Sequence, residues 1–367
     1  MSSKIPFVAL SKQFDFLKKD LINSFNKVGK SGNYILGKEV NLFEKRFAKL
    51  CNTKFAVGVG NGSDAIVFAL KSCGVKQGDE VIIPANSFIA TAWAVVACNA
   101  KPVYADICDD LNIDPLKIEN KISKKTKAII AVHYTGRIAK MKQILNIARK
   151  YNLDVIEDSA QAIGAKYYNK IAGSFGDCGC FSFHPLKNLG LYGDGGAISL
   201  NNKKKYNIIN LLRNHGLIDR DLCKIWGYNS RLDEIQASFA NIKLRYLNRW
   251  TMKHRSIASI YSKNLTSKVI TPTEYSYEQP VYHNYIILVN EREKLQEFLN
   301  SNNIETKIHY PIPLHLQPVS RKLGYKKGDM PKTEFLSKKI LSLPIYPELK
   351  DIQISRIIDK INHFFKQ

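Results

Sequence analysis

The chain has 367 residues and 45% of them are hydrophobic, which supplies a large core and excludes a disordered protein. Its seven cysteines are odd in number and scattered, which excludes a secreted disulfide framework. The only close pair, Cys178 and Cys180, is weak evidence for a metal site, so no metal is expected. The formal net charge of +23 would attract nucleic acid or phosphorylated ligands, but the lysine runs lack interleaved aromatics, so we expect a solvated surface and no nucleic-acid partner.

Between residues 54 and 200, short β-branched runs alternate with amphipathic stretches. This alternation predicts an α/β fold in which helices cover both faces of a large, mostly parallel sheet. The expected strands are Phe55–Val59, Glu80–Ile83, Pro102–Ala105, Ala128–Val132 and Asp154–Ile156, and Met141–Tyr151 has the spacing of a helix.

After about residue 248 the pattern changes to that of a smaller α+β unit. A long polar helix is expected first, followed by a strand at Val281–Val289, a helix at Glu291–Asn300, a strand near Thr306–His309, and a last helix that ends at Gln367. The prediction is therefore a large domain at 1–250, which includes the N-terminal segment, and a small C-terminal domain at 251–367.

The uncharged stretch Val81–Ala100 is long enough to cross a bilayer. Pro84 and the polar residues after it interrupt the stretch, so a strand, a turn and a helix explain it better than a membrane span. The segment Met1–Phe7 also lacks the apolar region of a signal peptide. We therefore expect a cytoplasmic protein with no membrane partner.

A glycine-rich turn, Val57-Gly58-Val59-Gly60-Asn61-Gly62-Ser63-Asp64, lies between an expected strand and a helix expected at Ala65–Ser72. Free N–H groups at a helix start can bind a phosphate, and glycine lets the anion approach. A dinucleotide fingerprint would need glycine at position 63, and there is no Walker lysine. The turn predicts a plain phosphate site with a serine hydroxyl, and a turn without ligand is the alternative.

Two ionisable residues occupy unusual positions. Asp158 ends an apolar strand at the edge of the sheet where ligands bind, and a protonated pyridine nitrogen would offset the cost of burying its carboxylate. An ordinary helix N-cap is the alternative for Asp158. Lys187 is flanked by Leu186 and Leu189, and an apolar environment lowers the pKa of an amine that forms an imine. A solvated surface lysine is the alternative for Lys187.

Five segments occur in an order that resembles the DegT/DnrJ/EryC1/StrS family of nucleotide-sugar aminotransferases. They are Asn61-Gly62-Ser63-Asp64-Ala65, Glu157-Asp158-Ser159-Ala160-Gln161-Ala162, Phe181-Ser182-Phe183-His184-Pro185-Leu186-Lys187-Asn188-Leu189-Gly190, Gly227-Tyr228-Asn229-Ser230-Arg231-Leu232-Asp233-Glu234-Ile235-Gln236-Ala237, and Ile308-His309-Tyr310-Pro311-Ile312-Pro313-Leu314-His315-Leu316-Gln317. The resemblance implies a fold type I (aspartate aminotransferase-like) enzyme that binds pyridoxal 5′-phosphate (PLP), passes through pyridoxamine 5′-phosphate (PMP), and works as a homodimer with active sites at the subunit interface.

The resemblance also implies a role for each matching residue. Lys187 matches the Schiff-base lysine, and Asp158 matches the carboxylate on the pyridine nitrogen. The other matches are Gln161 beside the phenolic oxygen, Gly62, Ser63 and Ser182 at the phosphate, Phe88 stacked on the ring, Asn229 reaching the phosphate of the other subunit, and His309 and Tyr310 near the sugar.

The reaction implied is amino transfer from L-glutamate to a nucleotide-linked keto-6-deoxyhexose, for an amino sugar of a surface glycan. The segment Ile308–Pro311 resembles members that act at C-3 of a dTDP-3-keto-6-deoxyhexose, and a C-4 aminotransferase on a UDP-, GDP- or dTDP-4-keto sugar is the alternative. Ile163, Tyr346 and the stretch His133–Arg137 depart from the common pattern, which we expect to affect the choice of sugar. Relatives that dehydrate carry histidine in place of Lys187. A non-catalytic regulatory or nucleic-acid-binding protein on the same fold is the remaining alternative.

Overall fold

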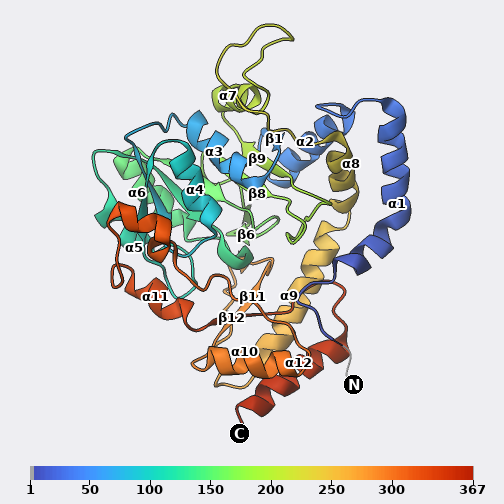
Figure 1. Cartoon of the computed structure of the whole chain (residues 1–367), viewed down its shortest axis with the longest axis vertical. Coiled ribbons are helices and arrows are strands. Elements are labelled where there is room, and N and C mark those ends of the chain that lie inside the picture. The colour runs from blue at the N-terminus through green and yellow to red at the C-terminus, as the bar shows by residue number, and fades with distance from the viewer. Residues whose placement is uncertain (1–3, 367) are drawn as a thin grey trace.

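The computed structural model describes residues 4–366, so Met1–Ser3 and the expected helix end at Gln367 lie outside the described part. A seven-stranded sheet with the order β1-β9-β8-β5-β4-β2-β3 forms the centre of the larger part of the molecule (Figure 1). All neighbouring strands from β8 to β3 are parallel, whereas β9 runs antiparallel to both β1 and β8. The predicted mixed, mostly parallel α/β sheet is therefore confirmed.

The strands of this sheet are β1 (Phe55–Val59), β2 (Glu80–Pro84), β3 (Lys101–Ala105), β4 (Thr126–Val132), β5 (Asp154–Asp158), β8 (Cys178–Ser182) and β9 (Gly196–Leu200). The helices around it are α1 (Leu10–Ser31), α2 (Lys38–Leu50), α3 (Gly62–Ser72), α4 (Ile89–Ala97), α5 (Pro115–Ile118), α6 (Met141–Tyr151), α7 (Lys203–Arg213) and α8 (Glu234–Lys243). The predicted strands are confirmed with ends that differ by a few residues, and the uncharged stretch after residue 80 forms β2 and α4.

Alternation along the strands explains why both faces of the sheet are covered. Successive strand side chains point to opposite faces. Ile83 and Ile130 accordingly pack in one core with α3, α4 and α7, whereas Ile82 and Ile129 pack in another core with α6. On this second face, the half of the sheet nearer β1 is covered by α2 and α8 through Phe43, Phe47 and neighbouring residues.

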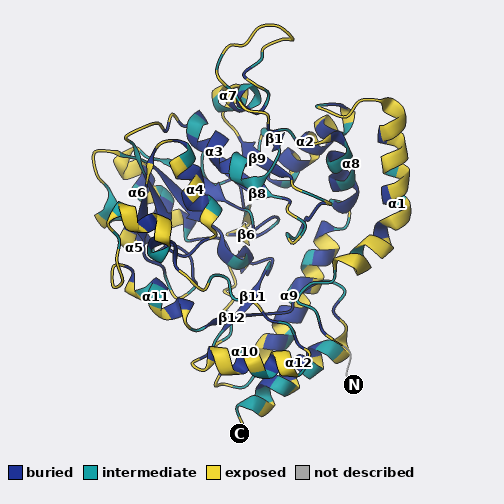
Figure 2. Cartoon of the chain, in the orientation of Figure 1, coloured by how far each residue is buried: buried dark blue, intermediate teal, exposed yellow. Residues whose placement is uncertain are grey.

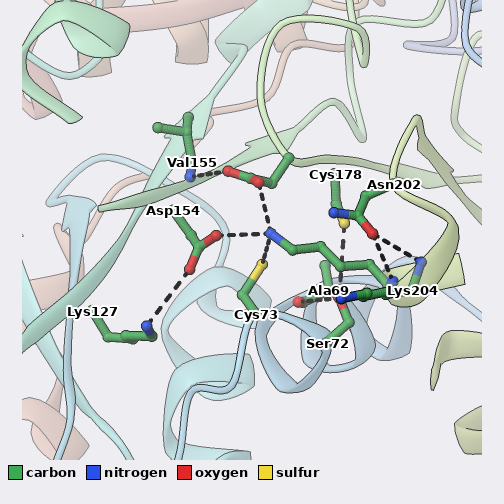
Figure 3. Close-up of polar contacts among 11 residues, drawn as sticks. Ala69, Ser72, Cys73, Lys127, Asp154, Val155, Cys178, Asn202 and Lys204 are labelled. Carbon is green, nitrogen blue, oxygen red and sulfur yellow. Dashed lines mark hydrogen bonds and ion pairs between the residues drawn. The ribbon is translucent and has the colours of Figure 1, made fainter. Parts of the chain in front are cut away.

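An ion cluster fixes α7 to the sheet (Figure 3). The Lys205 ammonium donates to Asp154 at 2.7 Å and to Asp177 at 2.6 Å, and it lies 3.3 Å from the Cys73 sulfur. Burial opposes the charge, but the thiol and the two carboxylates outweigh burial and raise the pKa of Lys205. Asp177 also accepts from the Val155 N–H, so the cluster joins α7 to the start of β5.

The C-terminal part contains α9 (Leu247–Asn264), β11 (Tyr285–Leu288), α10 (Arg292–Ser301), α11 (Pro331–Ser337), β12 (Ile340–Leu343) and α12 (Asp351–Phe364). Its short strand β10 (Glu278–Gln279) pairs with β6 (Lys166–Tyr167), which pairs in turn with β7 (Lys170–Ile171). β11 and β12 are antiparallel, and a separate core joins them to α9, α10 and α12. Ile5 lies in this core, and α9 contributes side chains to both parts, so a boundary near residue 250 stays a prediction.

One predicted element of this part is wrong. The expected strand near Thr306–His309 forms only a single bridge, between Lys307 and Ser342. The chain leaves the pairing at once because the next residues, His309 and Tyr310, turn into a cavity described below. The expected strand at Val281–Val289 is likewise shorter, as β11.

None of the helices in residues 4–366 is both long and apolar enough to cross a membrane. Within the same residues all seven cysteines are free, and no group of three or more histidine, cysteine or acidic side chains is arranged to hold a metal.

Candidate active site

A cavity of about 410 Å³ lies where the carboxyl end of the parallel strands meets the C-terminal part. Its walls contain every site residue predicted from the sequence except Asn229. These are Gly62, Ser63, Phe88, Asp158, Gln161, Ser182, Lys187, His309 and Tyr310. The walls also contain residues from the N-terminal segment (Phe7 to Leu10, and Gln13) and from the segment Ile345 to Glu348.

The glycine-rich turn forms a cup at one end of the cavity. Asn61 caps α3 by accepting from the Asp64 N–H at 2.8 Å, so the helix begins at Gly62, three residues earlier than predicted. A Cβ on residue 62 would lie 2.6 Å from the Cβ of Ser182, which is closer than side chains approach, so glycine is required there. The helix start and the hydroxyls of Ser63 and Ser182 face the same hollow and suit a phosphate.

Asp158 ends β5 and is buried with its carboxylate held from two sides. The Thr91 hydroxyl donates to Oδ2 at 2.8 Å, and the Ala160 N–H donates to Oδ1 at 3.2 Å. Ser87 lies 2.7 Å from the Thr91 hydroxyl, which fixes that hydroxyl in turn. No helix follows Asp158, so the helix N-cap alternative is wrong, and the carboxylate remains able to face a cationic group.

Lys187 follows the turn after β8 and is half-buried, not a solvated surface lysine. Burial lowers the pKa of its amine from 10.5 to about 8, and the attraction of Asp158 opposes this effect. Within residues 4–366, its Nζ has no hydrogen bond or ion pair. About a tenth of the amine is therefore unprotonated at pH 7 and free to react, far more than at the ordinary pKa of 10.5.

Gln161, Tyr310 and Phe88 line the space between these groups. The Gln161 amide oxygen accepts from the Thr135 N–H at 2.7 Å, and its nitrogen lies 3.4 Å from the Tyr310 hydroxyl. The Tyr310 ring lies 5.7 Å from that of Phe88, which is 55% exposed at the start of α4. Burial and the nearby Asp158 raise the pKa of the Tyr310 phenol, which therefore remains a hydrogen-bond donor.

Asn229 does not reach the cavity of its own chain. It is exposed and pairs with Asn214 at the base of a loop that follows α7 and projects from the body of the molecule (Figure 1). The loop carries Trp226, which is 95% exposed. The structure of one chain thus separates Asn229 from the other predicted site residues.

The positions that depart from the family pattern have different surroundings. Tyr346 lines the cavity, and its buried hydroxyl has no partner among the described residues. Ile163 instead packs in the core with α2 and α8. His133 is fully buried and donates from Nε2 to Glu157 at 2.9 Å, since its Nδ1 accepts from Ala139. The expectation that all three affect the choice of sugar therefore lacks support for Ile163 and His133.

Sequence reasoning missed two histidines that line the cavity, His254 on α9 and His283 before β11. Both are isolated in the sequence and lie outside the matching segments. The only local signal was the apolar spacing of α9, which puts His254 on the buried face with Trp250 and Ile257. Tertiary packing brings them to the cavity.

The fold and the site together define a family. The DegT/DnrJ/EryC1/StrS aminotransferase family profile matches residues 15–362, and the chain belongs to this family.

Individual relatives cover almost the whole chain. It is 43% identical over 99% of both chains to a protein from Geobacillus stearothermophilus named "Pleiotropic regulatory protein". It is 41% identical to the dTDP-3-amino-3,6-dideoxy-α-D-galactopyranose transaminase of Aneurinibacillus thermoaerophilus, over 98% of this chain and 99% of the relative. The crystal structure of Streptomyces venezuelae DesV in complex with a ketimine intermediate superposes with a TM-score of 0.97, at 35% identity and full coverage of both chains.

The residues of the cavity fit the cofactor of such an aminotransferase, PLP. A phosphate suits the cup at Gly62, Ser63 and Ser182, where only glycine leaves room beside Ser182. The buried Asp158 carboxylate has no cationic side chain bonded to it among the described residues, which leaves it for a protonated ring nitrogen. Lys187 offers a free amine in the same cavity.

Proposed function

We propose that this protein is a PLP-dependent sugar aminotransferase that moves an amino group from L-glutamate to C-3 of a dTDP-linked 3-keto-6-deoxyhexose. The observation that carries the proposal is one cavity with a phosphate cup, a buried carboxylate and an amine whose pKa is about 8. Belonging to the aminotransferase family supports the same reaction class.

Bound PLP supplies an electron sink that stabilises negative charge on the carbon next to the amino group. The chain supplies the positions and the protons. The N–H groups at the start of α3, with Ser63 and Ser182, would hold the phosphate, and Phe88 would lie against the ring. Asp158 would keep the ring nitrogen protonated, and Thr91 holds Asp158 in place.

Lys187 performs the proton transfer. Its amine removes the proton from the α-carbon of glutamate and later delivers a proton to C-3 of the sugar. A pKa of about 8 suits both directions better than the ordinary 10.5, because it lies closer to neutral pH and leaves both the free amine and the ammonium populated. Tyr310 and Gln161 contact each other in the same cavity and would position the cofactor and the sugar.

The relatives support the choice of substrate. A 41% identical relative is named as a transaminase of a dTDP-3-amino sugar, which favours C-3 over the C-4 alternative. Glutamate as the donor rests on the resemblance, and a cytoplasmic setting is expected because nucleotide sugars are made there. The name of the G. stearothermophilus relative concerns regulation, but the intact Lys187, Asp158 and phosphate cup support catalysis here.

The proposal is tested with the purified holoenzyme. Incubation with glutamate and a dTDP-3-keto-6-deoxyhexose should give the 3-amino sugar, and a dTDP-4-keto sugar should react at least tenfold more slowly. Lys187→Ala should abolish both turnover and the visible absorbance of bound cofactor. Faster reaction of the 4-keto sugar would overturn the choice of carbon, and normal turnover by Lys187→Ala would overturn the reaction class.

We further propose that the active enzyme is a homodimer in which Asn229 completes the cavity of the partner. The projecting loop supports this arrangement because it exposes the Trp226 ring. Exposure of a large apolar ring to water is unfavourable, and a partner subunit would cover it. The α1 helix also exposes Phe16 and Phe25, and Figure 2 shows α1 largely exposed.

Complementation tests the shared site. Lys187→Ala and Asn229→Asp should each be inactive alone, the second because a carboxylate repels phosphate. Equal amounts of the two variants are then mixed so that their subunits pair at random, and about half of the dimers contain one subunit of each variant. If Asn229 acts in the partner, each such dimer has one intact site of two, so about a quarter of the wild-type activity is restored. Recovery of no activity would place Asn229 in the cavity of its own chain.

A further inference from the structure

The part of the cavity away from the phosphate cup has a wall of hydrogen-bond acceptors. Within residues 4–366, Lys187 is the only lysine or arginine among the residues that line the cavity. The C-terminal part contributes His254, His283, His309 and Glu348 to this wall, which we call the acceptor wall. None of the four has a role in holding the cofactor.

Backbone contacts fix the tautomer of His254. Its Nδ1 lies 2.9 Å from the carbonyl oxygen of Trp250, and a carbonyl only accepts, so Nδ1 carries the proton. Nε2 then keeps a lone pair and can only accept while the ring is neutral. Burial lowers the pKa of His254 to about 4, so the ring is neutral at physiological pH.

A short relay fixes His283 in the same way. The Asn188 amide nitrogen donates to the carbonyl oxygen of Val281 at 3.3 Å, so the amide oxygen faces the other side, 3.0 Å from Nδ1 of His283. Nδ1 therefore carries the proton, and Nε2 is again an acceptor. Burial and the nearby Lys187 ammonium lower the pKa of His283 well below its ordinary value.

His309 and Glu348 complete the wall. Nδ1 of His309 lies 2.9 Å from the Ser342 hydroxyl, which can donate or accept and so does not fix the tautomer, and burial lowers the pKa of this ring to about 4. The Glu348 carboxylate is half-buried and has no hydrogen bond or ion pair to another described residue. Burial raises its pKa, against the attraction of Lys12 and Lys243.

The acceptors of this wall match hydroxyl groups, and the Glu348 carboxylate repels another carboxylate. Sugar hydroxyls donate hydrogen bonds, and neutral imidazoles and a carboxylate accept them. A uronate bound against this wall would bring its charge toward Glu348, which has no ion pair among the described residues, and like charges close together in a partly desolvated site are costly.

We propose that the acceptor wall selects a keto-sugar that is neutral and bears hydroxyls, and that Glu348 excludes keto-uronates. This inference rests on the proposed function, since it names the substrate class of the same site. The distinction is relevant within the family, because a 36% identical relative from Pseudomonas aeruginosa is named as an aminotransferase of a 3-oxo-glucuronate.

The test uses two dTDP-linked 3-amino sugars that differ only at C-6, one with the CH₃ of a 6-deoxyhexose and one with a carboxylate. The holoenzyme converts each in the reverse direction with 2-oxoglutarate, which avoids the unstable keto sugars. We expect kcat/KM at least tenfold higher for the neutral sugar. Glu348→Gln should reduce this preference to threefold or less, mainly through a lower KM for the uronate.

Glu297→Gln is the matched control, because it removes the same charge from an exposed position of α10 that does not line the cavity. It should keep the tenfold preference. Equal kcat/KM for the two sugars in the wild type, or an unchanged preference in Glu348→Gln, would refute the inference while leaving the aminotransferase proposal intact. A protein that turns over neither sugar, with or without visible cofactor absorbance, would instead refute the proposed function.

A second measurement examines the histidines without activity. The ¹⁵N chemical shifts of the rings should show His254 and His283 as neutral Nδ1–H tautomers between pH 6 and 8. A protonated ring at either position at pH 7 would contradict the acceptor wall, because a charged imidazole has no free lone pair and attracts carboxylates.

Discussion

Lys187→Met should stabilise the cofactor-free protein, although it destroys the reaction. The amine of Lys187 is nearly free of partners in the folded chain, so its charge is opposed by burial and compensated only by the attraction of Asp158. Its pKa falls from 10.5 in the unfolded chain to about 8 in the folded one. Each pKa unit corresponds to about 1.36 kcal/mol, so a neutral side chain of similar length should gain up to about 3 kcal/mol at pH 7.

The sign of the pH dependence follows from proton binding. Between pH 8 and 10.5 the unfolded chain binds more protons at this lysine than the folded chain does, so the stability of the wild type rises with pH in that window. The variant lacks this rise. The gap between the two proteins should therefore shrink from about 3 kcal/mol at pH 7 to about 2 kcal/mol at pH 9.

Urea unfolding of both cofactor-free proteins, at one protein concentration and at pH 7 and pH 9, measures the gap. Lys243→Met is the matched comparison. Burial also lowers the pKa of Lys243 to about 8, but its ammonium donates to the Gly190 carbonyl and to Gln13, so its loss should destabilise the protein by about 1–3 kcal/mol. The reasoning about Lys187 fails if Lys187→Met is no more stable than the wild type at pH 7, or if the gap does not change with pH.

Three further outcomes test the site and its scaffold. Gly62→Ala should weaken cofactor binding at least tenfold, because the new Cβ would lie 2.6 Å from the Ser182 side chain. Gly29→Ala, whose Cβ would have nothing within 4 Å, should leave binding unchanged in the same absorbance titration. Equal affinities of the two variants would contradict the phosphate cup. Asp158→Asn should move the midpoint of the pH dependence of cofactor incorporation below about 8, because the carboxylate that raises the pKa of Lys187 is lost. An unchanged or higher midpoint would contradict this coupling between Asp158 and Lys187. Lys205→Met should lower the free energy of unfolding by about 2 kcal/mol, because the carboxylates of Asp154 and Asp177 lose their cation. No change in urea unfolding would show that the ion cluster does not hold α7.

The elements that the sequence predicted well are those whose pattern is local. β1 and α6 have the predicted ends, because a continuous apolar run in β1 and helical apolar spacing in α6 extend over the whole element. The predicted strand near Thr306–His309 failed for the opposite reason. Its residues are β-like, but their direction is decided by Ser342 and by the cavity, which lie far away in the chain.

The same distinction applies to the site. The sequence by itself determined which residues are candidates for the chemistry, because the positions of Lys187 after a strand, Asp158 at a strand end and Gly62 at a helix start are local features with a physical reason. Only the tertiary structure decided that they share one cavity, that burial lowers the pKa of Lys187 to about 8, and that two histidines from the C-terminal part join them. Desolvation and hydrogen-bond partners depend on residues distant in the chain, so no local pattern specifies them.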